Sequence, residues 1–246
     1  MVGVDAATAT VLFADGTSKH RRQIDPNIHA QHGRHSAFRF LVREEEVLAD
    51  PVTAEFFAAR NSMDLWYAEK RKVVIYRCAN NELLNFVCIH PKEQSSVATD
   101  SYSTMADKSL LLDIFHDFDP RLVTMLRKAD PKSLRVYPLF DMEPLETFVK
   151  DKLALLGDAA HPFLPHLGQG GAMAIEDGIS LGVMLSNLAS VEDIPARLRL
   201  YNEARYERAT LVQTYTRIVG GDGLKSSQTS TSDLSGKCPA RRLDYE

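Results

Sequence analysis

The sequence predicts an α/β protein in which strands and helices are mixed along the chain, and three stretches carry this prediction. Residues 63–90 contain two strand-like runs around a tight turn. Residues 153–188 pass from a short apolar run through a loop of prolines and glycines into a helix of small residues, and residues 196–219, opened by Pro195, predict a second long helix. With 246 residues, the chain can form one large domain or two small ones.

The composition is that of an ordinary globular protein, with 44% hydrophobic and 25% charged residues. The net charge of −4 offers no basic surface for nucleic acid. The three cysteines, Cys78, Cys88 and Cys238, are odd in number and lack metal-ligand spacing, which favours a reducing compartment. No signal peptide or membrane span is evident. We therefore expect a cytoplasmic protein that binds neither nucleic acid nor a membrane.

The first part of the chain predicts short strands and helical turns. Residues 2–13 predict two short strands joined by a turn. The histidine-rich stretch 27–34 is interpreted as a solvated loop rather than a metal site, because no pattern brings its histidines together. Residues 35–43 predict a strand with phenylalanines on one face, followed by a helical turn at 44–50 and a helix that restarts at Pro51.

Residues 63–90 form the clearest hairpin, because asparagines in its Ala-Asn-Asn-Glu turn tolerate a positive φ. Both arms carry apolar residues on both faces, so we expect the sheet to be covered on each side. Aromatic residues here are candidates for the wall of a substrate pocket, although on strands they more often fill a core. These aromatic residues are Trp66, Tyr67, Tyr76 and Phe86.

The middle of the chain alternates loops, helices and a strand. Residues 92–108 are rich in Ser, Thr and Asp and predict a surface loop. Residues 109–119 predict an amphipathic helix, and Pro120 opens another through Lys128. The run at 133–140 predicts a further strand, in which Pro138 keeps the preceding residue extended.

The stretch 155–188 carries the clearest chemistry. Asp158 follows a buried strand, where an unpaired carboxylate is costly, and it can accept two hydroxyl hydrogen bonds from a polyol such as a ribityl chain. Prolines stiffen the loop that follows, while Gly168, Gly170 and Gly171 leave room for backbone to approach a flat ligand. If a helix begins near Gly171, its first N–H groups favour negative charge on that ligand.

Two helices end the patterned part of the chain. In the first helix Gly178 and Gly182 lie four residues apart and allow another backbone to pack closely, so we expect this helix to be largely buried. The second helix has an apolar seam, with Arg205 and Arg208 pointing outward or pairing. The seam consists of Leu198, Tyr201, Ala204, Ala209, Val212, Tyr215 and Val219. From Gly220 the chain has little to bury and predicts a flexible tail.

The run GDAAHPFLPHLGQGGAMAIEDG resembles the C-terminal flavin-binding motif of FAD-dependent aromatic hydroxylases. These are group A flavin monooxygenases of the salicylate hydroxylase and para-hydroxybenzoate hydroxylase type. The resemblance implies that Asp158 contacts the flavin ribityl chain and that Pro165 lies by the ring near the substrate. It also implies that the glycine loop, with Gly168, lies close to the flavin. The backbone N–H groups of Gly170, Gly171 and Ala172 would then face the flavin pyrimidine.

Two other interpretations of this motif stay open from the residues alone. The glycine-rich loop could be an ordinary turn without a ligand. His161 and His166 could be a metal pair, although their spacing does not place them on one helical face and no Cys or carboxylate cluster accompanies them. We therefore expect no metal.

The same resemblance implies an incomplete FAD-binding, Rossmann-like domain combined with a substrate domain built on a mixed sheet. No GxGxxG motif is present, although the family uses one to hold the FAD pyrophosphate. The Ala-Asp-Gly at 14–16 fits a displaced second flavin motif, the hairpin that precedes it, or a surface turn. The expected organisation is a remnant of the FAD-binding domain at 1–34, the substrate domain at 35–140, the C-terminal part of the FAD-binding domain at 141–220 and a flexible tail at 221–246.

The activity that the resemblance implies is a FAD-dependent monooxygenase, an oxidoreductase typical of secondary metabolism. Such an enzyme uses NAD(P)H and O₂ to hydroxylate an aromatic or polyketide-like small molecule. His161 and His166 are candidate bases by chemistry, but no catalytic residue is identified. The main alternative is a truncated, cofactor-free and inactive relative or an interaction protein, because the contacts to the adenine half of FAD are missing. A flavin halogenase or dehydrogenase would share much of the framework.

Overall fold

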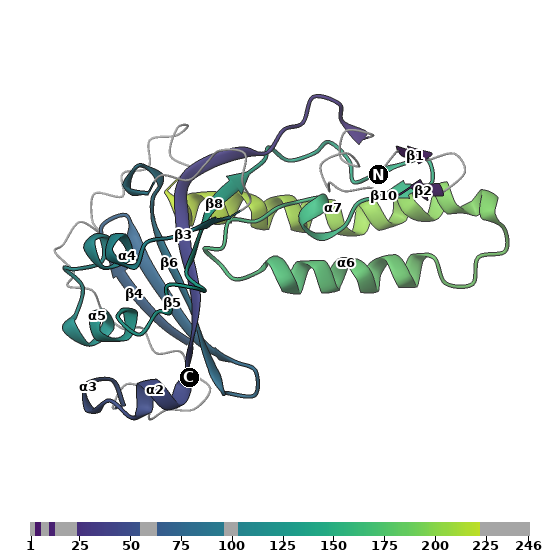
Figure 1. Ribbon diagram of the computed structural model, residues 1–246. Helices are drawn as coiled ribbons and strands as arrows, with labels where there is room; N and C mark the ends of the chain where they lie inside the picture. The colour runs from purple at the N-terminus through teal and green to yellow at the C-terminus, as the bar shows by residue number, and fades with distance from the viewer. Residues whose placement is uncertain (1–2, 6–9, 13–23, 55–62, 96–102, 222–246) are drawn as a thin grey trace. The chain divides into compact units, whose positions relative to one another are not determined.

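The computed structural model describes residues 3–5, 10–12, 24–54, 63–95 and 103–221 (Figure 1). These residues divide into two compact units. The second unit is His32–Leu139, and the first unit contains the described residues up to Gln31 and those from Phe140 onward. Helices combine with a large antiparallel sheet, which confirms the predicted mixed α/β class.

A six-stranded sheet forms the framework of the second unit, with the strand order β4-β5-β6-β3-β8-β7. Every pairing whose register is described, β3 with β6, β4 with β5, β5 with β6 and β7 with β8, is antiparallel. The strands are β3 (Gln31–Arg43), β4 (Met63–Ala68), β5 (Arg71–Cys78), β6 (Leu83–Pro91), β7 (Thr104–Met105) and β8 (Arg135–Asp141).

The turns of this sheet follow from residues that tolerate a positive φ. Between β5 and β6, Ala79, Asn80 and Asn81 have φ angles of 50°, 55° and 69°, so the predicted hairpin turn is confirmed. Lys70, with a φ of 58°, forms the turn between β4 and β5. The hairpin at 63–90 is therefore a three-stranded meander rather than two arms alone.

Two helices, α4 (Lys108–Ile114) and α5 (Pro120–Leu126), cover one face of the sheet (Figure 1). Each begins at an aspartate whose side chain accepts a backbone N–H: Asp107 from Ser109, and Asp119 from Arg121. Their apolar sides join the strands in one core, and its aromatic members from the sheet are Phe38, Phe40, Trp66 and Phe86. Short helices α2 (Glu44–Leu48) and α3 (Pro51–Ala54) follow β3, and the 3₁₀ helix η2 (Lys92–Gln94) follows β6.

The opposite face of the sheet is only partly covered, which corrects the expectation of a sheet covered on each side. Trp66 is buried in the core, whereas the next residue, Tyr67, points to the other face and is 40% exposed. Tyr76 is also 40% exposed, and Leu41 is 45% exposed. The alternation of side chains along a strand therefore divides the four predicted aromatic residues between a core and a free face.

A second correction concerns residues 31–34, predicted as part of a loop. Strand β3 already begins at Gln31 and takes in this polar stretch. At Gly33 the backbone lies so close to the Leu139 carbonyl oxygen of β8 that an added Cβ would be 3.1 Å from it. Pairing of the backbone decides the structure here, and the polar composition of the stretch does not reveal it.

The first unit is built around two long helices, α6 (Gly170–Met184) and α7 (Ile194–Gly220), which lie side by side (Figure 1). Two small antiparallel pairs accompany them: β1 (Gly3–Asp5) with β2 (Thr10–Leu12), and β9 (Val149–Lys150) with β10 (Leu153–Ala154). The 3₁₀ helices are η3 (Gly157–Ala159) and η4 (Val191–Asp193). The buried core between these elements consists of Met142, Leu145, Phe148, Leu155, Ala160, Met173, Tyr201 and Ala209.

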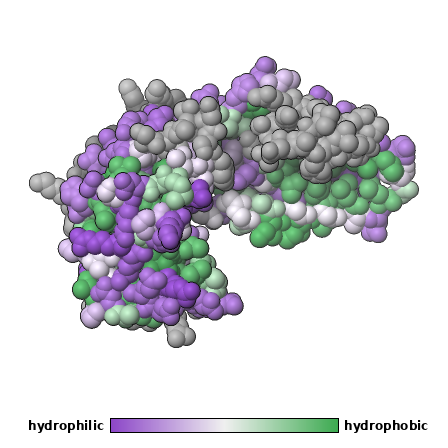
Figure 2. Space-filling view, in the orientation of Figure 1, coloured by the Kyte–Doolittle hydropathy of each residue, from purple (hydrophilic) through white to green (hydrophobic). Residues whose placement is uncertain are grey.

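Helix α6 is not largely buried, contrary to the prediction. Only Met173 and Asp177 are buried along it, while Ile175, Ile179 and Val183 are between 62% and 65% exposed. Figure 2 shows this helix as a run of hydrophobic surface. Within the described part of the chain, no other backbone packs on the two-glycine face either, because a Cβ at Gly178 or Gly182 would meet nothing there within 4 Å. The helix packs through one narrow stripe, and its apolar composition overstated its burial.

The buried stripe of α7 also departs from the predicted seam, first at Ala204, which is exposed while Arg205 beside it is buried, and again after Ala209. Tyr215 and Val219 are 51% exposed, whereas Gln213 is 1% exposed. The amide nitrogen of Gln213 donates to the Met142 carbonyl over 2.8 Å, whereas its Oε1 atom is buried without a partner among the described residues. The helix ends at Gly221 with a left-handed φ of 80°, and the rest of the predicted tail lies outside the described residues. No helix in the described part of the chain is long and apolar enough to cross a membrane.

Candidate functional site

The candidate site lies in the first unit, where β10 leads through a tight turn and a loop into α6. The turn is η3, which begins at Gly157 with a left-handed φ of 56°. The Gly157 carbonyl accepts the N–H groups of Ala160 and His161, both over 2.9 Å. Asp158 is exposed on this turn, so its carboxylate is presented at the surface.

The loop that follows leaves its glycines bare. A Cβ at Gly168, whose φ is 65°, or at Gly171 would meet nothing within 4 Å. At Gly170 the nearest atom would be the ring of Phe163, at 4.0 Å. Pro165 is half-buried in the same loop. The loop therefore offers an open strip of backbone that a flat ligand can approach.

The start of α6 leaves its first backbone donors available. The first helical hydrogen bond runs from the Met173 N–H to the Gln169 carbonyl over 2.9 Å, so the N–H groups of Gly170, Gly171 and Ala172 precede the ladder. Gln169, at the cap position, makes no capping hydrogen bond with its side chain. This end of the helix favours a ligand with partial negative charge. A flavin pyrimidine fits these donors, and the bare glycines leave room for its ring.

The two candidate histidines of the motif occupy different surroundings. His161 is fully buried, and its Nε2 lies 2.6 Å from Oδ2 of Asp177. The ring thus makes a structural contact inside the fold, and its candidate role as a base stays a prediction. The ring of His166 lies against α7, since a Cβ at Gly220 would be 2.6 Å from it. Among the residues that the structure describes, no group of three or more His, Cys, Asp or Glu side chains could hold a metal ion.

Behind the loop lies a buried charged network centred on Asp177 of α6. Its carboxylate accepts the Gly157 N–H over 2.8 Å and pairs with Nε of Arg205 on α7, also over 2.8 Å. Burial by itself would raise the pKa of Asp177, but the hydrogen bonds from His161, Gly157 and Arg205 outweigh it and keep the pKa below its usual range. The carboxylate is therefore ionised at neutral pH.

The network continues outward to Glu176, which pairs with Arg205 over 2.8 Å and receives two hydrogen bonds from Arg208 over 2.8 and 2.9 Å. Hydrogen bonding from Arg208, with a further contribution from Arg205, lowers the pKa of Glu176 to about 2. The predicted alternative that these arginines pair is thus confirmed, and Arg205 is buried rather than outward.

A second helix contact holds the strand end that precedes the turn. The Tyr201 hydroxyl donates to the Leu155 carbonyl over 2.9 Å. Neither Asp177 nor Tyr201 was among the site residues predicted from the sequence. One signal was available for Asp177, because an acidic residue in a helix of small and apolar residues is costly to bury without a partner.

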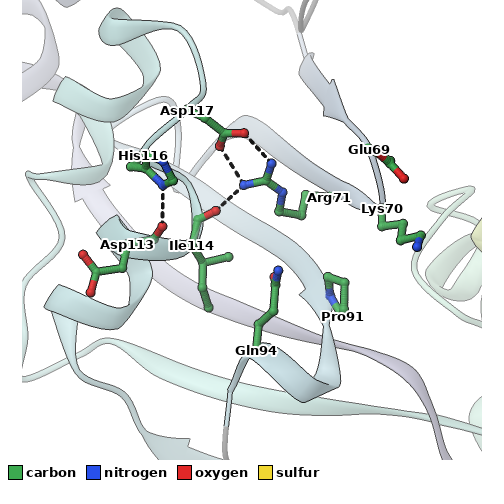
Figure 3. Close-up of a pocket in the computed structure, with 9 residues that line it drawn as sticks. All are labelled: Glu69, Lys70, Arg71, Pro91, Gln94, Asp113, Ile114, His116 and Asp117. Atoms are coloured by element: carbon green, nitrogen blue, oxygen red, sulfur yellow. Dashed lines mark hydrogen bonds and ion pairs between the residues drawn. The ribbon is translucent and has the colours of Figure 1, made fainter.

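The second unit has its own surface hollow of about 500 Å³, shown in Figure 3. Arg71 reaches into it but is already bonded to both carboxylate oxygens of Asp117, over 2.7 and 2.6 Å, and to the Ile114 carbonyl. Because its guanidinium makes these bonds, Arg71 links β5 to the end of α4. The hollow is therefore not a prepared ligand site.

Residues 18–216 match the model of a family described as FAD binding domain. The chain belongs to this family. The match confirms the resemblance to FAD-dependent aromatic hydroxylases that the motif at 157–178 predicted.

Individual relatives agree with this assignment. The FAD-dependent monooxygenase cfoG of Aspergillus candidus is 35% identical over 182 residues, which are 72% of this chain and 42% of that protein. Hispidin-3-hydroxylase of Neonothopanus nambi is 36% identical over 148 residues, which are 59% of this chain and 34% of that protein. A salicylate hydroxylase structure in a substrate complex superposes with a TM-score of 0.70 at 27% identity, covering 84% of this chain and 53% of that chain. The chain thus spans less than half the length of these two curated relatives.

Proposed function

We propose that the chain is the flavin-contacting portion of an FAD-dependent monooxygenase that uses NAD(P)H and O₂ to hydroxylate an aromatic or polyketide-like small molecule. One observation carries this proposal. A bare, glycine-rich loop leads into a helix whose first N–H groups are outside the helical ladder, and an exposed carboxylate stands on the turn before it. FAD, when bound, supplies the hydride acceptor and the site that reacts with O₂.

The residues of this chain hold and orient the cofactor in the proposal. Asp158 accepts hydrogen bonds from ribityl hydroxyls, and Pro165 stiffens the rim by the ring. Gly168 and Gly170 keep the approach free of side chains. The N–H groups of Gly170, Gly171 and Ala172 stabilise negative charge on the pyrimidine.

The second unit fits the substrate domain of this proposal. Tyr67 and Tyr76 stand half-exposed on the free face of its sheet, opposite the face covered by α4 and α5. Phenol side chains suit the flat, aromatic substrates of this proposal. The proposed domain organisation keeps the predicted boundaries near residues 34 and 140. A cytoplasmic location stays a prediction.

A cofactor-free relative is the second candidate, and one observation favours it. The apolar face of α6 exposes Ile175, Ile179 and Val183 by more than 60% each. This is more apolar surface than one helix of a soluble domain usually leaves uncovered. A chain with such a face and without a pyrophosphate-binding motif could hold FAD weakly or not at all.

Titration of FAD into the purified chain, followed by flavin fluorescence, decides between the two candidates. We expect saturable binding, and we expect Asp158→Ala to raise Kd about tenfold or more, since a hydrogen bond to a charged group contributes about 1.5–3 kcal/mol. Glu203→Ala is the matched control, because Glu203 is an exposed acid on α7. Absence of binding by the unaltered chain would establish the cofactor-free alternative. If both substitutions changed the Kd for FAD equally, Asp158 would not be part of the FAD-binding site.

A further inference from the structure

We propose that Asp177 is a positioning residue, which never touches the cofactor but fixes the Gly157 turn so that Asp158 is held at the flavin surface. The inference rests on the proposed function, since it assigns a means of presenting the ribityl-binding carboxylate. Its physical basis, the fixing of the turn, can be tested without any flavin.

The Asp177 carboxylate joins the turn, the loop and α7 to its own helix, α6. Its Oδ2 atom accepts from the Gly157 N–H over 2.8 Å and lies 2.6 Å from Nε2 of His161. Its Oδ1 atom accepts from Nε of Arg205 on α7 over 2.8 Å. The side chain is completely buried, so water does not compete for any of these bonds. One carboxylate thereby ties the turn, the loop and the two helices together.

The turn needs this attachment because its backbone is demanding. Gly157 has a left-handed φ, and a Cβ there would be 3.1 Å from the Cβ of Ala174, one helical turn before Asp177. The turn is therefore pressed against α6 at the place where Asp177 reaches back to it. Loss of the hydrogen bond would leave the buried Gly157 N–H without its acceptor and the turn free to move off the helix.

The strand end is fixed on its other side by Tyr201. The hydroxyl of Tyr201 donates to the Leu155 carbonyl, two residues before the N–H that Asp177 accepts. These two bonds bracket Leu156 and set the direction in which the chain leaves the strand. Asp158 follows directly and is exposed. Its position is thus determined by residues on α6 and α7 that lie behind it.

The placement of His161 agrees with this role. Its Nε2 atom lies 2.6 Å from Oδ2 of Asp177, whereas Nδ1 is buried and has no hydrogen-bond partner among the residues that the structure describes. With a proton on Nε2, the ring donates to Asp177. Asp177 then receives three donors, which an amide of the same shape cannot do, because the amide nitrogen of Asp177→Asn would face a donor.

The first arm of the test measures amide hydrogen exchange in the chain without FAD. We expect the Gly157 N–H to be protected, and its exchange to become at least about tenfold faster in Asp177→Asn. Arg208→Gln is the matched control, because among the described residues Arg208 pairs with Glu176 alone, at the exposed edge of the network. Unchanged protection of Gly157 in Asp177→Asn would overturn the proposal.

The second arm is a double-mutant cycle on the Kd for FAD. If Asp177 acts through Asp158, Asp177→Asn raises Kd about tenfold in the natural chain and less than about twofold in the Asp158→Ala background. Independent, multiplying effects would show a general structural role and overturn the proposal. Tyr201→Phe keeps the ring, and it should show the same coupling should Asp177→Asn fail to fold.

The two arms separate the two hypotheses. If the unaltered chain binds no FAD while Asp177→Asn still releases the Gly157 amide, the proposed function fails and the fixing of the turn stands. If FAD binds and the effects are independent, the proposed function stands and the positioning role fails.

Discussion

Replacement of Lys72 by methionine should stabilise the protein at neutral pH. Lys72 lies on β5 between Tyr67 of β4 and Ile89 of β6, and it is only 7% exposed. Within the described part of the chain, no hydrogen bond or ion pair holds its ammonium group. Burial consequently lowers the pKa of Lys72 from 10.5 to about 8. Methionine is similar in length and carries no charge, so it removes the cost and keeps the packing.

The size and sign of the effect follow from proton linkage. The gap between 10.5 and about 8 corresponds to about 3 kcal/mol at about 1.36 kcal/mol per pH unit. Below pH 8 the lysine is charged in both states, and the folded state bears the whole cost. As the pH rises from 8 to 10.5 the folded protein releases this proton first, so stability increases. Above 10.5 the cost has disappeared.

Urea unfolding followed by Trp66 fluorescence measures this directly, because Trp66 is the single tryptophan and is buried in the same sheet. At pH 7 we expect Lys72→Met to unfold with a free energy up to about 3 kcal/mol larger than that of the natural chain. The difference should shrink between pH 8 and 10. Exposed Lys132, changed to methionine, is the control and should alter little at any pH. A variant of equal or lower stability at pH 7, or a difference independent of pH, would refute the reasoning.

Three further substitutions test the packing. Gly157→Ala should cost about 1–2 kcal/mol of folding free energy in urea unfolding, because alanine is strained at a positive φ; an unchanged midpoint would contradict the left-handed turn. Arg205→Ala should cost about 3–5 kcal/mol by leaving a buried carboxylate short of its partner, whereas Arg208→Ala at the exposed edge should change the midpoint little. Phe86→Ala, which removes a fully buried ring stacked on Phe40, should lower the folding free energy by about 3–5 kcal/mol, measured by urea unfolding followed through Trp66 fluorescence.

The sequence allowed prediction of the elements whose causes are local. The hairpin between β5 and β6 was predictable because asparagines accept the positive φ that its turn requires. The start of α6 was predicted near Gly171 and is found at Gly170, since glycines and prolines mark the end of the loop. The candidate flavin loop was predictable for the same reason, and because its motif is long and free of gaps.

Burial was harder to predict, because it depends on which neighbour a helix meets. The apolar residues of α6 led to the prediction of a largely buried helix, yet Ile175, Ile179 and Val183 are exposed in the described structure. Hydrophobic composition measures what a helix can bury and not what is present to cover it. The same limit applies to α7, where polar Gln213 takes a buried place that a purely apolar criterion assigns to a neighbour.

The network around Asp177 shows most clearly why the site was only half predictable. Asp177 lies 20 residues from Gly157 and 28 from Arg205, so no local spacing relates them. The motif allowed prediction of the residues that would contact a ligand, because glycines and an acidic residue in a loop are recognisable in the sequence. The residues that hold them are buried charged groups. The cost of burying each charge is offset only because the others pair with it. Substituting any one of them therefore tests the arrangement of the turn, the loop and both helices together, and the coupling between Asp177 and Asp158 measures how far that arrangement reaches the candidate flavin surface.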